Sequence, residues 1–389
     1  MRICRVATVP FFVLHHLRSQ LLDLARAGHE VIVVASPDDG ADEVARLPGV
    51  RFSPVDIARP IAPVRDAAAL WRLYRLFRRL RPDIVHSTTP KAGLLCAIAA
   101  WLARVPVRLH TFTGQAWAEL SGPVRWIAQA CDWLIVRLNT RSYADSASQR
   151  EFLVERGLAP PDRLSVLGSG SLAGVDLALF DPERLRHDAP ATRVRLGLSP
   201  HARVVTFIGR VTRDKGMVEL VHAFTELRQR FPDLVLVVVG PLEPERDPLP
   251  DEILQQLRSD ARIHLIGYDP SPEQYLALAT VLCLPSYREG FGNVVIEAAA
   301  LGIPAVGTLI TGLSDAIVDG RTGMLVPAKD SAALTAALAT VLENEPLRRG
   351  LGEAARLRAI AEFDSRVVNG HLMREYAALM QMTSGRATR

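Results

Sequence analysis

Two glutamates, Glu289 and Glu297, lie eight positions apart, and an apolar run over residues 294–301 overlaps the second of them. The run predicts a short buried helix, and Asn293 before it is a suitable N-cap residue. Glu289 then lies on the loop before this helix, while Glu297 lies about one turn inside it. Carboxylates in such places can accept hydrogen bonds from sugar hydroxyls. The alternative is a solvated loop glutamate next to a structural helix glutamate.

The turn between the two glutamates reads Gly290-Phe291-Gly292-Asn293. Its glycines let a ligand approach the backbone closely. The free N–H groups and the positive dipole end at the start of the predicted helix favour an anionic phosphate. A sugar nucleotide carries phosphates in its middle and hydroxyls at both ends. We therefore expect Phe291, Gly292 and Asn293 to line the site of such a donor.

A second segment places two cations between a strand and a helix. The strand expected over residues 204–208 ends at Gly209, and the next helix is expected from Met217, with Arg210 and Lys215 on the loop between them. We expect Gly209 to line the donor site. Two cations on a strand-to-helix turn can clamp a diphosphate and stabilise the charge that develops on it as a sugar–phosphate bond breaks. The alternative is a solvated basic loop.

The elements that must position these residues alternate between short apolar strands and amphipathic helices. Such alternation predicts an α/β protein whose parallel sheets are covered by helices on both faces. Several prolines interrupt the pattern over residues 173–200. We therefore predict two Rossmann-like domains, over residues 1–180 and 201–363, joined by a linker over residues 181–200.

Two polar loops follow predicted strands in the first half of the chain. Lys91 lies after the strand that begins near residue 83, and His110 and Thr113 lie near the end of the strand over residues 107–112. Ligands of open α/β sheets bind outside the carboxyl ends of the strands. We therefore expect Lys91, His110 and Thr113 to line an acceptor-side cleft. A structural role for His110 is equally compatible with the sequence.

The charge of the chain is unevenly distributed. The net charge is +4, and residues 1–185 hold 23 Arg and Lys against 18 Asp and Glu, a balance of +5. This excess predicts an anionic partner, either a membrane surface or a phosphorylated acceptor. The helix expected over residues 66–80 is one candidate contact, because Arg72, Arg75 and Arg79 share its polar face. Nucleic acid is not expected, since no nucleic-acid-binding motif is present.

Several absences in the sequence narrow the function further. The longest apolar run, over residues 92–103, is too short to cross a bilayer. The four cysteines lack metal-ligand spacing, so we expect free thiols in a reducing cytosol. No Asp-x-Asp motif is present, so we expect catalysis without a metal and without a cofactor other than a nucleotide-sugar co-substrate.

These motifs resemble those of a known enzyme family. The segment from Pro285 to Pro304 is similar to the Glu-x7-Glu signature of the retaining family-4 glycosyltransferases, which have the GT-B fold. The segment from Gly209 to Gly216 resembles the Gly-Arg-x4-Lys-Gly element of the same family. The resemblance implies two Rossmann-like domains whose parallel sheets face each other across a cleft. It also implies a C-terminal helix over residues 364–389 that returns toward the first domain.

The resemblance also implies roles for the candidate residues. Arg210 and Lys215 would stabilise the leaving diphosphate. Glu289 would orient the hydroxyls of the donor sugar, and Glu297 would hold the ribose hydroxyls. The reaction would retain the anomeric configuration by front-face attack, with the departing phosphate accepting the proton of the acceptor. Many members have a histidine where Thr113 stands in this chain, which is a departure from the family pattern.

The first-domain loops resemble a subgroup that extends lipid-linked glycans for capsule, O-antigen or glycoprotein assembly. For this subgroup we expect transfer of a hexose or N-acetylhexosamine from a UDP-sugar to a polyprenyl-diphosphate-linked saccharide. The enzyme would then be cytoplasmic and peripheral on the inner face of the plasma membrane, in contact with its anionic surface. The alternatives are a GT-B sugar-nucleotide epimerase, which needs different acid–base groups, and a catalytically silent nucleotide-sugar-binding subunit.

Overall fold

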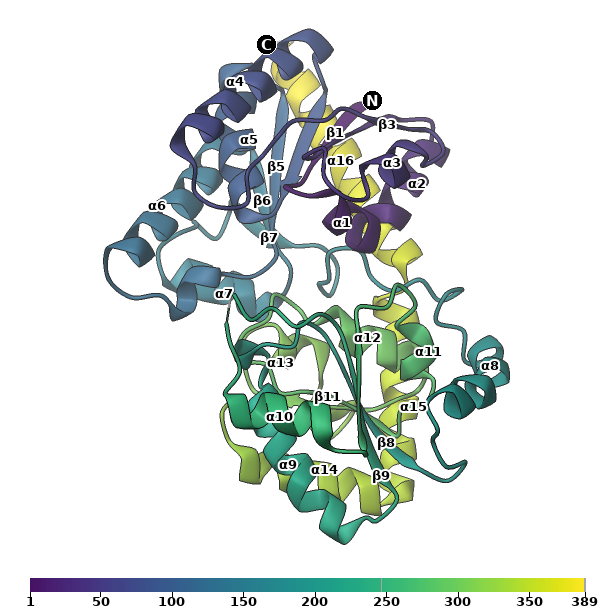
Figure 1. Ribbon diagram of the computed structural model, residues 1–389. Helices are drawn as coiled ribbons and strands as arrows, with labels where there is room; N and C mark the ends of the chain where they lie inside the picture. The colour runs from purple at the N-terminus through teal and green to yellow at the C-terminus, as the bar shows by residue number, and fades with distance from the viewer. Residues whose placement is uncertain (246, 388–389) are drawn as a thin grey trace. The chain divides into compact units, whose positions relative to one another are not determined.

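The structure is a computed structural model that describes residues 1–245 and 247–387, without the side chains of residues 116, 119 and 384–387. The chain divides into two compact units. One consists of Met1–Gly174 and Ser365–Arg389, and the other consists of Val175–Asp364. Each unit contains one parallel β-sheet with helices on both faces (Figure 1). The predicted α/β class with two parallel sheets is therefore confirmed.

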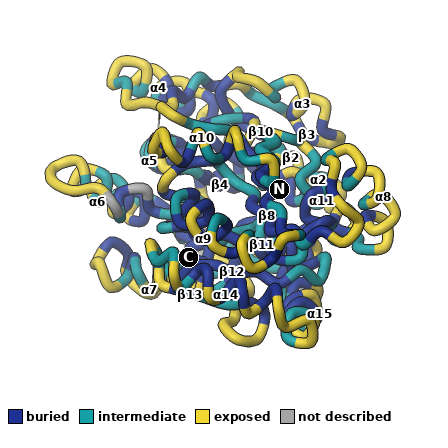
Figure 2. Tube along the Cα trace, turned by 60° about the horizontal axis from the view of Figure 1, so that its bottom comes forward, coloured by how far each residue is buried: buried dark blue, intermediate teal, exposed yellow. Residues whose placement is uncertain are grey.

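The sheet of the first unit has seven strands, and all its strand pairs are parallel. Its strands are mostly buried (Figure 2), because helices cover both faces. In spatial order the strands are β3 (Val50–Phe52), β2 (Glu30–Val34), β1 (Arg2–Val6), β4 (Ile84–Thr88), β5 (Val107–Phe112), β6 (Arg141–Ala144) and β7 (Leu164–Val166).

Three long helices of the first unit, α4, α5 and α6, are neighbours in sequence and in space. Helix α4 buries Leu73 and Phe77 and exposes Arg72 and Arg75 on its opposite face. Helix α5 is apolar on all sides because α4 and α6 both pack against it. The helical segments of this unit are α1 (Pro10–Phe12), the π-helix η1 (Val13–Leu17), α2 (Arg18–Arg26), α3 (Ala41–Ala45), α4 (Pro63–Leu80), α5 (Pro90–Leu102), the 3₁₀ helix η2 (Ala116–Glu119), α6 (Gly122–Leu138), α7 (Ala147–Glu155) and α16 (Ser365–Ala387).

The C-terminal helix α16 belongs to the first unit although it follows the second unit in the sequence. Its Asn369 side chain donates a hydrogen bond of 2.8 Å to Asp23. The hydroxyl of its Tyr376 lies 2.7 Å from Nδ1 of His86 on strand β4. These polar contacts fix the register of α16 against α2 and the sheet of the first unit. The last two residues of the predicted range 364–389 lie outside the described residues.

The second unit has a parallel sheet of six strands. In spatial order they are β10 (Ile263–Gly267), β9 (Leu234–Val239), β8 (Arg203–Ile208), β11 (Val281–Leu284), β12 (Ala305–Thr308) and β13 (Gly323–Val326). The helical segments are α8 (Pro182–Arg195), the 3₁₀ helix η3 (Arg213–Lys215), α9 (Met217–Arg230), α10 (Asp251–Ser259), α11 (Glu273–Leu276), α12 (Asn293–Ala300), α13 (Leu313–Ala316), α14 (Ser331–Glu343) and α15 (Glu345–Glu362).

The segment that we predicted as an irregular linker, residues 181–200, is largely helical. Asp181 is the N-cap of α8 and accepts a hydrogen bond of 2.9 Å from the backbone N–H of Glu183, and Pro182 occupies the first helical position. Aspartate at the N-cap and proline at N1 start a helix rather than break one. Pro190 lies inside the helix without ending it. The helix is part of the second unit, which begins at Val175, so this segment is mostly helical rather than irregular.

The structure also bears on the membrane-spanning segments and the cysteines considered in the sequence. Among the described residues, no helix combines the length and the apolar character needed to span a bilayer. All four cysteines are free thiols, and Cys4, Cys96 and Cys283 are buried.

Candidate active site

The loop after β8, which carries Arg210 and Lys215, and the loop after β11, which carries Glu289, meet at neighbouring strand ends of the second unit. Strands β8 and β11 pair in parallel, with Val205 opposite Val281, so the loops that follow them leave the same edge of the sheet. The loops are also in direct contact. Gly216 has a φ of +72°, and a Cβ atom on it would lie only 2.0 Å from the carbonyl oxygen of Pro285. The close approach and the positive φ both require glycine there.

An ion pair joins one charged residue from each loop. The Nζ atom of Lys215 lies 2.5 Å from Oε1 of Glu289. Ser286 donates a second hydrogen bond of 2.8 Å to the same oxygen, and the Thr308 hydroxyl in turn donates to the backbone carbonyl of Ser286. Both charged side chains are about 15% exposed (14% and 15%). The contacts hold Glu289 in place while leaving part of each charged group open to a ligand.

Arg210 is held by carboxylates from two directions. Its Nη1 lies 3.1 Å from Glu243, and its Nη2 lies 3.6 Å from Asp214. Asp214 also accepts from Arg288 at 2.9 Å and from the Thr212 hydroxyl at 2.5 Å. Burial alone would raise the pKa of Asp214, but the Thr212 hydrogen bond and the charges of Arg210 and Arg288 outweigh it and hold the pKa below its ordinary value. An ionised Asp214 therefore fixes Arg210.

The start of helix α12 differs from the prediction by one residue. Gly292, with a φ of +90°, is the N-cap, and Asn293 is the first helical residue rather than the cap. Gly292 leaves no space for a side chain, because a Cβ there would lie 2.6 Å from Leu313. Phe291 was expected at the donor site, but its side chain is buried and packs against Phe363 with ring centroids 5.2 Å apart. Only its backbone is available for a ligand.

Among the predicted donor residues, Glu297 has an ionisable side chain, and its pKa is raised. It lies in α12, and burial raises the pKa of its carboxyl to about 7, with a further contribution from Glu273 at the start of α11. Burial also raises the pKa of Glu273. Within the described part of the chain, no hydrogen bond reaches the Glu297 carboxylate. A shifted and unpartnered carboxylate next to a helix N-terminus is typical of a ligand-binding position.

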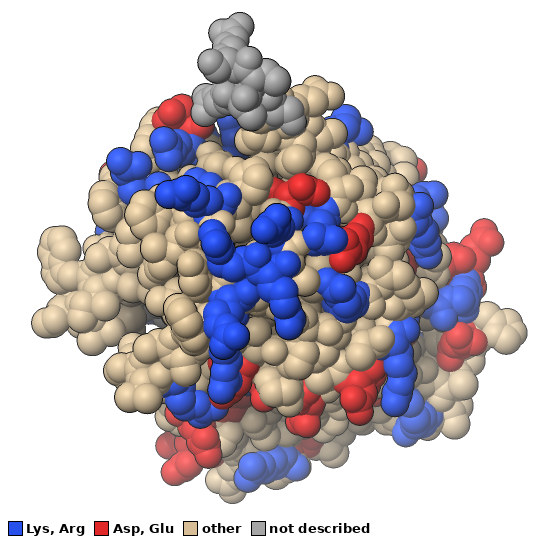
Figure 3. Space-filling view, turned by 90° about the horizontal axis from the view of Figure 1, so that it is seen from above, with Lys and Arg blue, Asp and Glu red and all other residues tan. Residues whose placement is uncertain are grey.

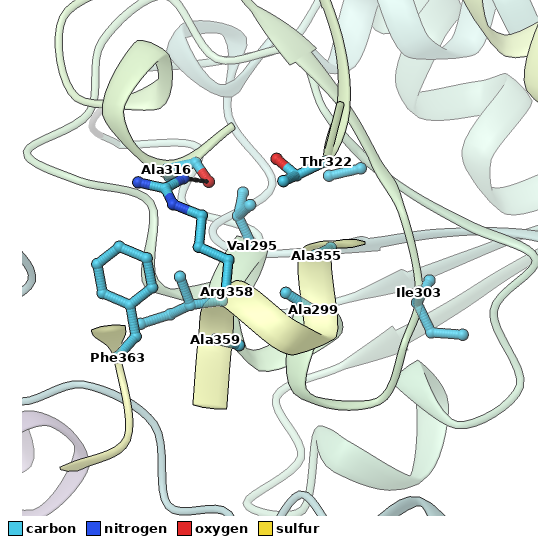
Figure 4. Close-up of a pocket in the computed structure, with 11 residues that line it drawn as sticks. Val295, Ala299, Ile303, Ala316, Thr322, Ala355, Arg358, Ala359 and Phe363 are labelled. Atoms are coloured by element: carbon cyan, nitrogen blue, oxygen red, sulfur yellow. Dashed lines mark hydrogen bonds between the residues drawn. The ribbon is translucent and has the colours of Figure 1, made fainter. Parts of the chain in front are cut away.

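The opposite face of α12 is structural. Val295 and Ala299 line a small apolar void between α12 and α15, together with Arg358, whose guanidinium donates to the carbonyl of Ala316 (Figure 4). The void, of about 10 Å³, is about large enough for one water molecule. It is therefore too small for a nucleotide and serves as the packed support of α12.

The three residues predicted for the acceptor side lie in the first unit. Lys91 is at the start of α5, and its Nζ lies 2.9 Å from Asp66. His110 is 1% exposed, and its Nδ1 lies 2.9 Å from the Ser87 hydroxyl. Burial, with a smaller contribution from a nearby arginine, lowers the pKa of His110 to about 3, so its imidazole is neutral. Thr113 directly follows strand β5 and is half-buried. These contacts favour the structural alternative for His110.

Sequence reasoning missed the carboxylates that surround the predicted residues: Asp214 and Glu243, which hold Arg210, and Glu273, which raises the pKa of Glu297. Asp214 lies between two basic residues on the loop that follows β8, and its role was not predicted. Glu243 follows strand β9 and Glu273 begins α11, so both come from other parts of the chain. The charge alternation Arg213-Asp214-Lys215 was the one signal available in the sequence. The partners of Glu243 and Glu273 depend on strand order, which no local pattern reveals.

The fold and the ion-paired site together define a protein of the GT-B glycosyltransferase class, and comparisons with known proteins agree. The family model described as glycosyl transferases group 1 matches residues 188–358, and the glycosyl transferase 4-like domain model matches residues 15–170. D-inositol 3-phosphate glycosyltransferase from Nocardia farcinica is 31% identical over 318 residues, which covers 78% of this chain and 68% of that protein. Capsular polysaccharide biosynthesis glycosyltransferase CapM from Staphylococcus aureus is 29% identical over 370 residues, 95% of each chain. The chain therefore belongs to the family-4 glycosyltransferases.

Solved structures agree with the GT-B fold. The Anabaena protein HepE, crystallised in complex with UDP and glucose, has a TM-score of 0.79 at 19% identity, covering 97% of this chain and 100% of that chain. UDP-GlcNAc 2-epimerase from Neisseria meningitidis has a TM-score of 0.67 at 18% identity, covering 96% and 100%. At these identities the likeness concerns the fold alone, and transferases share it with epimerases.

Proposed function

We propose that this glycosyltransferase moves a hexose or N-acetylhexosamine from a UDP-sugar to a polyprenyl-diphosphate-linked saccharide, with retention of anomeric configuration. The observation that carries the proposal is the ion pair between Lys215 and Glu289, which joins the diphosphate-clamp loop to the sugar-binding loop. An epimerase would need different acid–base groups, and a silent binding subunit would not need this complete set of charged residues.

The charged groups of the site fit departure of a nucleoside diphosphate. Lys215 has three N–H donors, so it can keep its contact with Glu289 while a second N–H reaches the leaving phosphate. Arg210, fixed by Asp214 and Glu243, supplies a second cation that needs no rearrangement during the reaction. Glu289 accepts hydrogen bonds from the donor sugar, and Glu297 accepts them from the ribose. The departing phosphate takes the proton of the attacking hydroxyl.

The similar proteins support the donor and acceptor classes to different degrees. HepE was solved with UDP and with UDP-glucose, which supports a UDP-linked donor. The name of CapM supports an acceptor from capsular polysaccharide assembly. Several relatives are named D-inositol 3-phosphate glycosyltransferases, which makes an inositol phosphate the second candidate acceptor.

The acceptor is tested by incubating the protein with a panel of nucleotide sugars and three acceptors. These are a short polyprenyl-diphosphate-linked saccharide, inositol 3-phosphate, and water alone. We expect transfer to the lipid-linked saccharide, with the product's anomeric configuration matching that of the donor. Transfer to inositol 3-phosphate instead would move the enzyme to the second candidate. A change in the donor sugar without transfer would identify an epimerase, and donor binding without chemistry would identify a silent subunit.

We also propose that turnover needs no divalent metal, because Arg210 and Lys215 supply the positive charge that a metal would otherwise bring to the leaving phosphate. Activity in excess EDTA is expected to stay within about twofold of untreated enzyme, which is small beside the 10²–10³-fold effect of losing a preorganised charge donor. Loss of turnover in EDTA, with recovery on adding Mg²⁺ or Mn²⁺, would contradict the proposal.

The proposed lipid-linked acceptor places the enzyme at the cytoplasmic face of the plasma membrane as a peripheral protein. The basic excess of residues 1–185 supports contact with an anionic surface there. The first unit contains most of the basic residues of this range.

A further inference from the structure

A basic recess lies at the amino ends of three strands of the first unit, on the edge of the sheet opposite the carboxyl ends where Thr113 lies. Arg108 is at the start of β5, Arg137 is in the last turn of α6 before β6, and Arg163 directly precedes β7. Together with Trp101 they line a recess of about 420 Å³. The three arginines are far apart in the sequence, and the parallel strand order brings them together.

The recess has more positive charge than the described residues neutralise. Arg108 is tethered by hydrogen bonds to the carbonyls of Leu138 at 2.9 Å and Val105 at 2.7 Å. Its pKa is lowered by burial and by the nearby charge of Arg163. The side chains of Arg137 and Arg163 are exposed, and in the part of the chain that the structure describes they have no hydrogen-bond or ion-pair partner.

One carboxyl group, that of Asp162, also lines this recess, and it forms no ion pair within the described residues. Three guanidinium groups against one carboxylate leave a net positive site. Guanidinium groups bind phosphate oxygens through paired N–H donors. The recess therefore suits a phosphate group with more than one free oxygen.

An exposed tryptophan face adjoins the recess. On α6, Trp126 is 74% exposed and Trp133 is 50% exposed, and Trp133 lies one turn before Arg137 on the same face. Trp101, which lines the recess, is 52% exposed. Figure 2 shows α6 with much of its length exposed. Large apolar side chains clustered in water mark an interaction surface, and tryptophan favours the interface of a bilayer, where its ring is half apolar and its N–H can stay hydrated.

We propose that the recess and the tryptophan face of α6 dock on an anionic phospholipid bilayer, with a lipid phosphate in the recess and Trp126 and Trp133 among the headgroups. An anionic bilayer is the partner that complements this surface in charge, because the exposed tryptophan face of α6 ends at the arginines of the recess. Figure 3 looks onto this edge of the first unit's sheet and shows basic side chains gathered near its middle. The inference rests on the membrane location in the proposed function and names the surface responsible for it.

The arginine face of α4 is the competing surface and supplies the matched control. Arg72 and Arg75 are exposed on α4, one turn apart, and belong to the same unit. They do not line the recess. Arg72→Gln/Arg75→Gln and Arg137→Gln/Arg163→Gln therefore remove the same charge from the same unit, and all four side chains are exposed, so both variants are expected to fold.

The experiment measures by sedimentation how the full chain binds to phosphatidylcholine vesicles with and without about 30 mol% phosphatidylglycerol. Quenching of tryptophan fluorescence by brominated lipids is measured in the same samples. Wild type is expected to bind the anionic vesicles, with quenched fluorescence. The recess variant is expected to lose roughly 25-fold in partitioning, the equivalent of about 2 kcal/mol for two basic residues. The α4 variant is expected to change about threefold or less, the screened long-range effect of the same charge loss. Trp126→Ser/Trp133→Ser is expected to lose the quenching.

Equal losses in the two charge variants would overturn the proposal in favour of general attraction to the basic unit. Inhibition of vesicle binding by millimolar inorganic phosphate without bromolipid quenching would assign the recess to free phosphate. A dimer that forms without vesicles and disappears in the Trp126→Ser/Trp133→Ser variant would assign the face to a second copy of the chain. Failure of the proposed function has a separate signature, namely that wild type transfers no sugar to the lipid-linked acceptor in detergent, where vesicle docking is not required.

Discussion

Replacing Lys215 or Arg210 by alanine is expected to lower kcat by roughly 10²–10³, the effect of losing one preorganised charge donor at a site where negative charge develops. In the proposed mechanism the two cations act on charge that appears as the sugar–phosphate bond breaks, so kcat should fall more than KM rises. Release of nucleoside diphosphate under saturating donor and acceptor measures the effect.

Arg213 provides the control for this prediction. It lies on the same loop, carries the same charge and is exposed. Arg213→Ala should keep turnover within about twofold of wild type, the range of a solvated charge. Turnover near the wild-type level in both Lys215→Ala and Arg210→Ala would remove the diphosphate clamp from the mechanism. An equal loss in Arg213→Ala would show that the loop acts by its total charge and not by its fixed geometry.

The pairing of Lys215 with Glu289 adds a test of mechanism. Each residue holds the other, with 2.5 Å between Nζ and Oε1. Removing either one displaces its partner, so their effects cannot be independent. The double variant Lys215→Ala/Glu289→Gln should therefore lose much less than the product of the two single losses. Multiplicative losses would mean that the two side chains act separately on phosphate and sugar.

The sequence was most informative where chemistry and local structure coincide. The loops after β8 and β11 could be predicted because a buried strand, glycines and charged residues occur within about ten positions of one another. The sequence also predicted the two sheets, since parallel strands buried on both faces are apolar throughout. The sequence could not predict which side chain pairs with each charged residue. Glu243 reaches Arg210 because β9 lies next to β8 in the sheet, and Arg163 reaches the recess because β7 follows β6.

Two interpretations of the sequence can be compared with the local structure. Asp181-Pro182 was interpreted as a break in regular structure, but proline is disfavoured inside a helix and favoured at its first position. His110 was considered for the acceptor site because it lies near the end of a strand. The alternation of side chains along β5 turns it instead toward α5, where a Cβ on Gly93 would come within 2.4 Å of its ring. A glycine opposite a buried histidine indicates packing.

Replacing Glu297 by glutamine is expected to affect donor binding and stability in opposite directions. In the proposed donor site the carboxylate accepts ribose hydroxyls. Hydrogen bonds to charged groups contribute about 1.5–3 kcal/mol, so the affinity for UDP at pH 8 should fall roughly 10- to 100-fold. The pKa of Glu297 is raised to about 7 by burial and by Glu273. Protonation below pH 7 removes an acceptor, so wild-type affinity should also fall as the pH is lowered, whereas the variant should lack this component.

The sign of the stability effect follows from the same pKa. Because the folded protein holds the Glu297 proton more tightly than the unfolded chain does, stability declines as the pH rises from the ordinary pKa of a glutamate toward 7, and the loss is complete above 7. Glu297→Gln cannot ionise. It should raise the free energy of unfolding at pH 8 by about 1–2 kcal/mol, after allowance for partial exposure, and leave it nearly unchanged at pH 4.

Calorimetric titration with UDP and thermal unfolding, each at several pH values, measure both effects. UDP itself titrates near neutrality, but the variant meets the same ligand, so the difference between the two proteins isolates Glu297. Glu273→Gln is the second comparison, because removing the neighbouring carboxylate should shift the Glu297 transition to lower pH without abolishing donor binding. If Glu297→Gln binds UDP as wild type does and is no more stable at pH 8, Glu297 is an ordinary helix residue. If it is more stable and binds UDP weakly, the unpartnered carboxylate lowers stability in order to bind the donor.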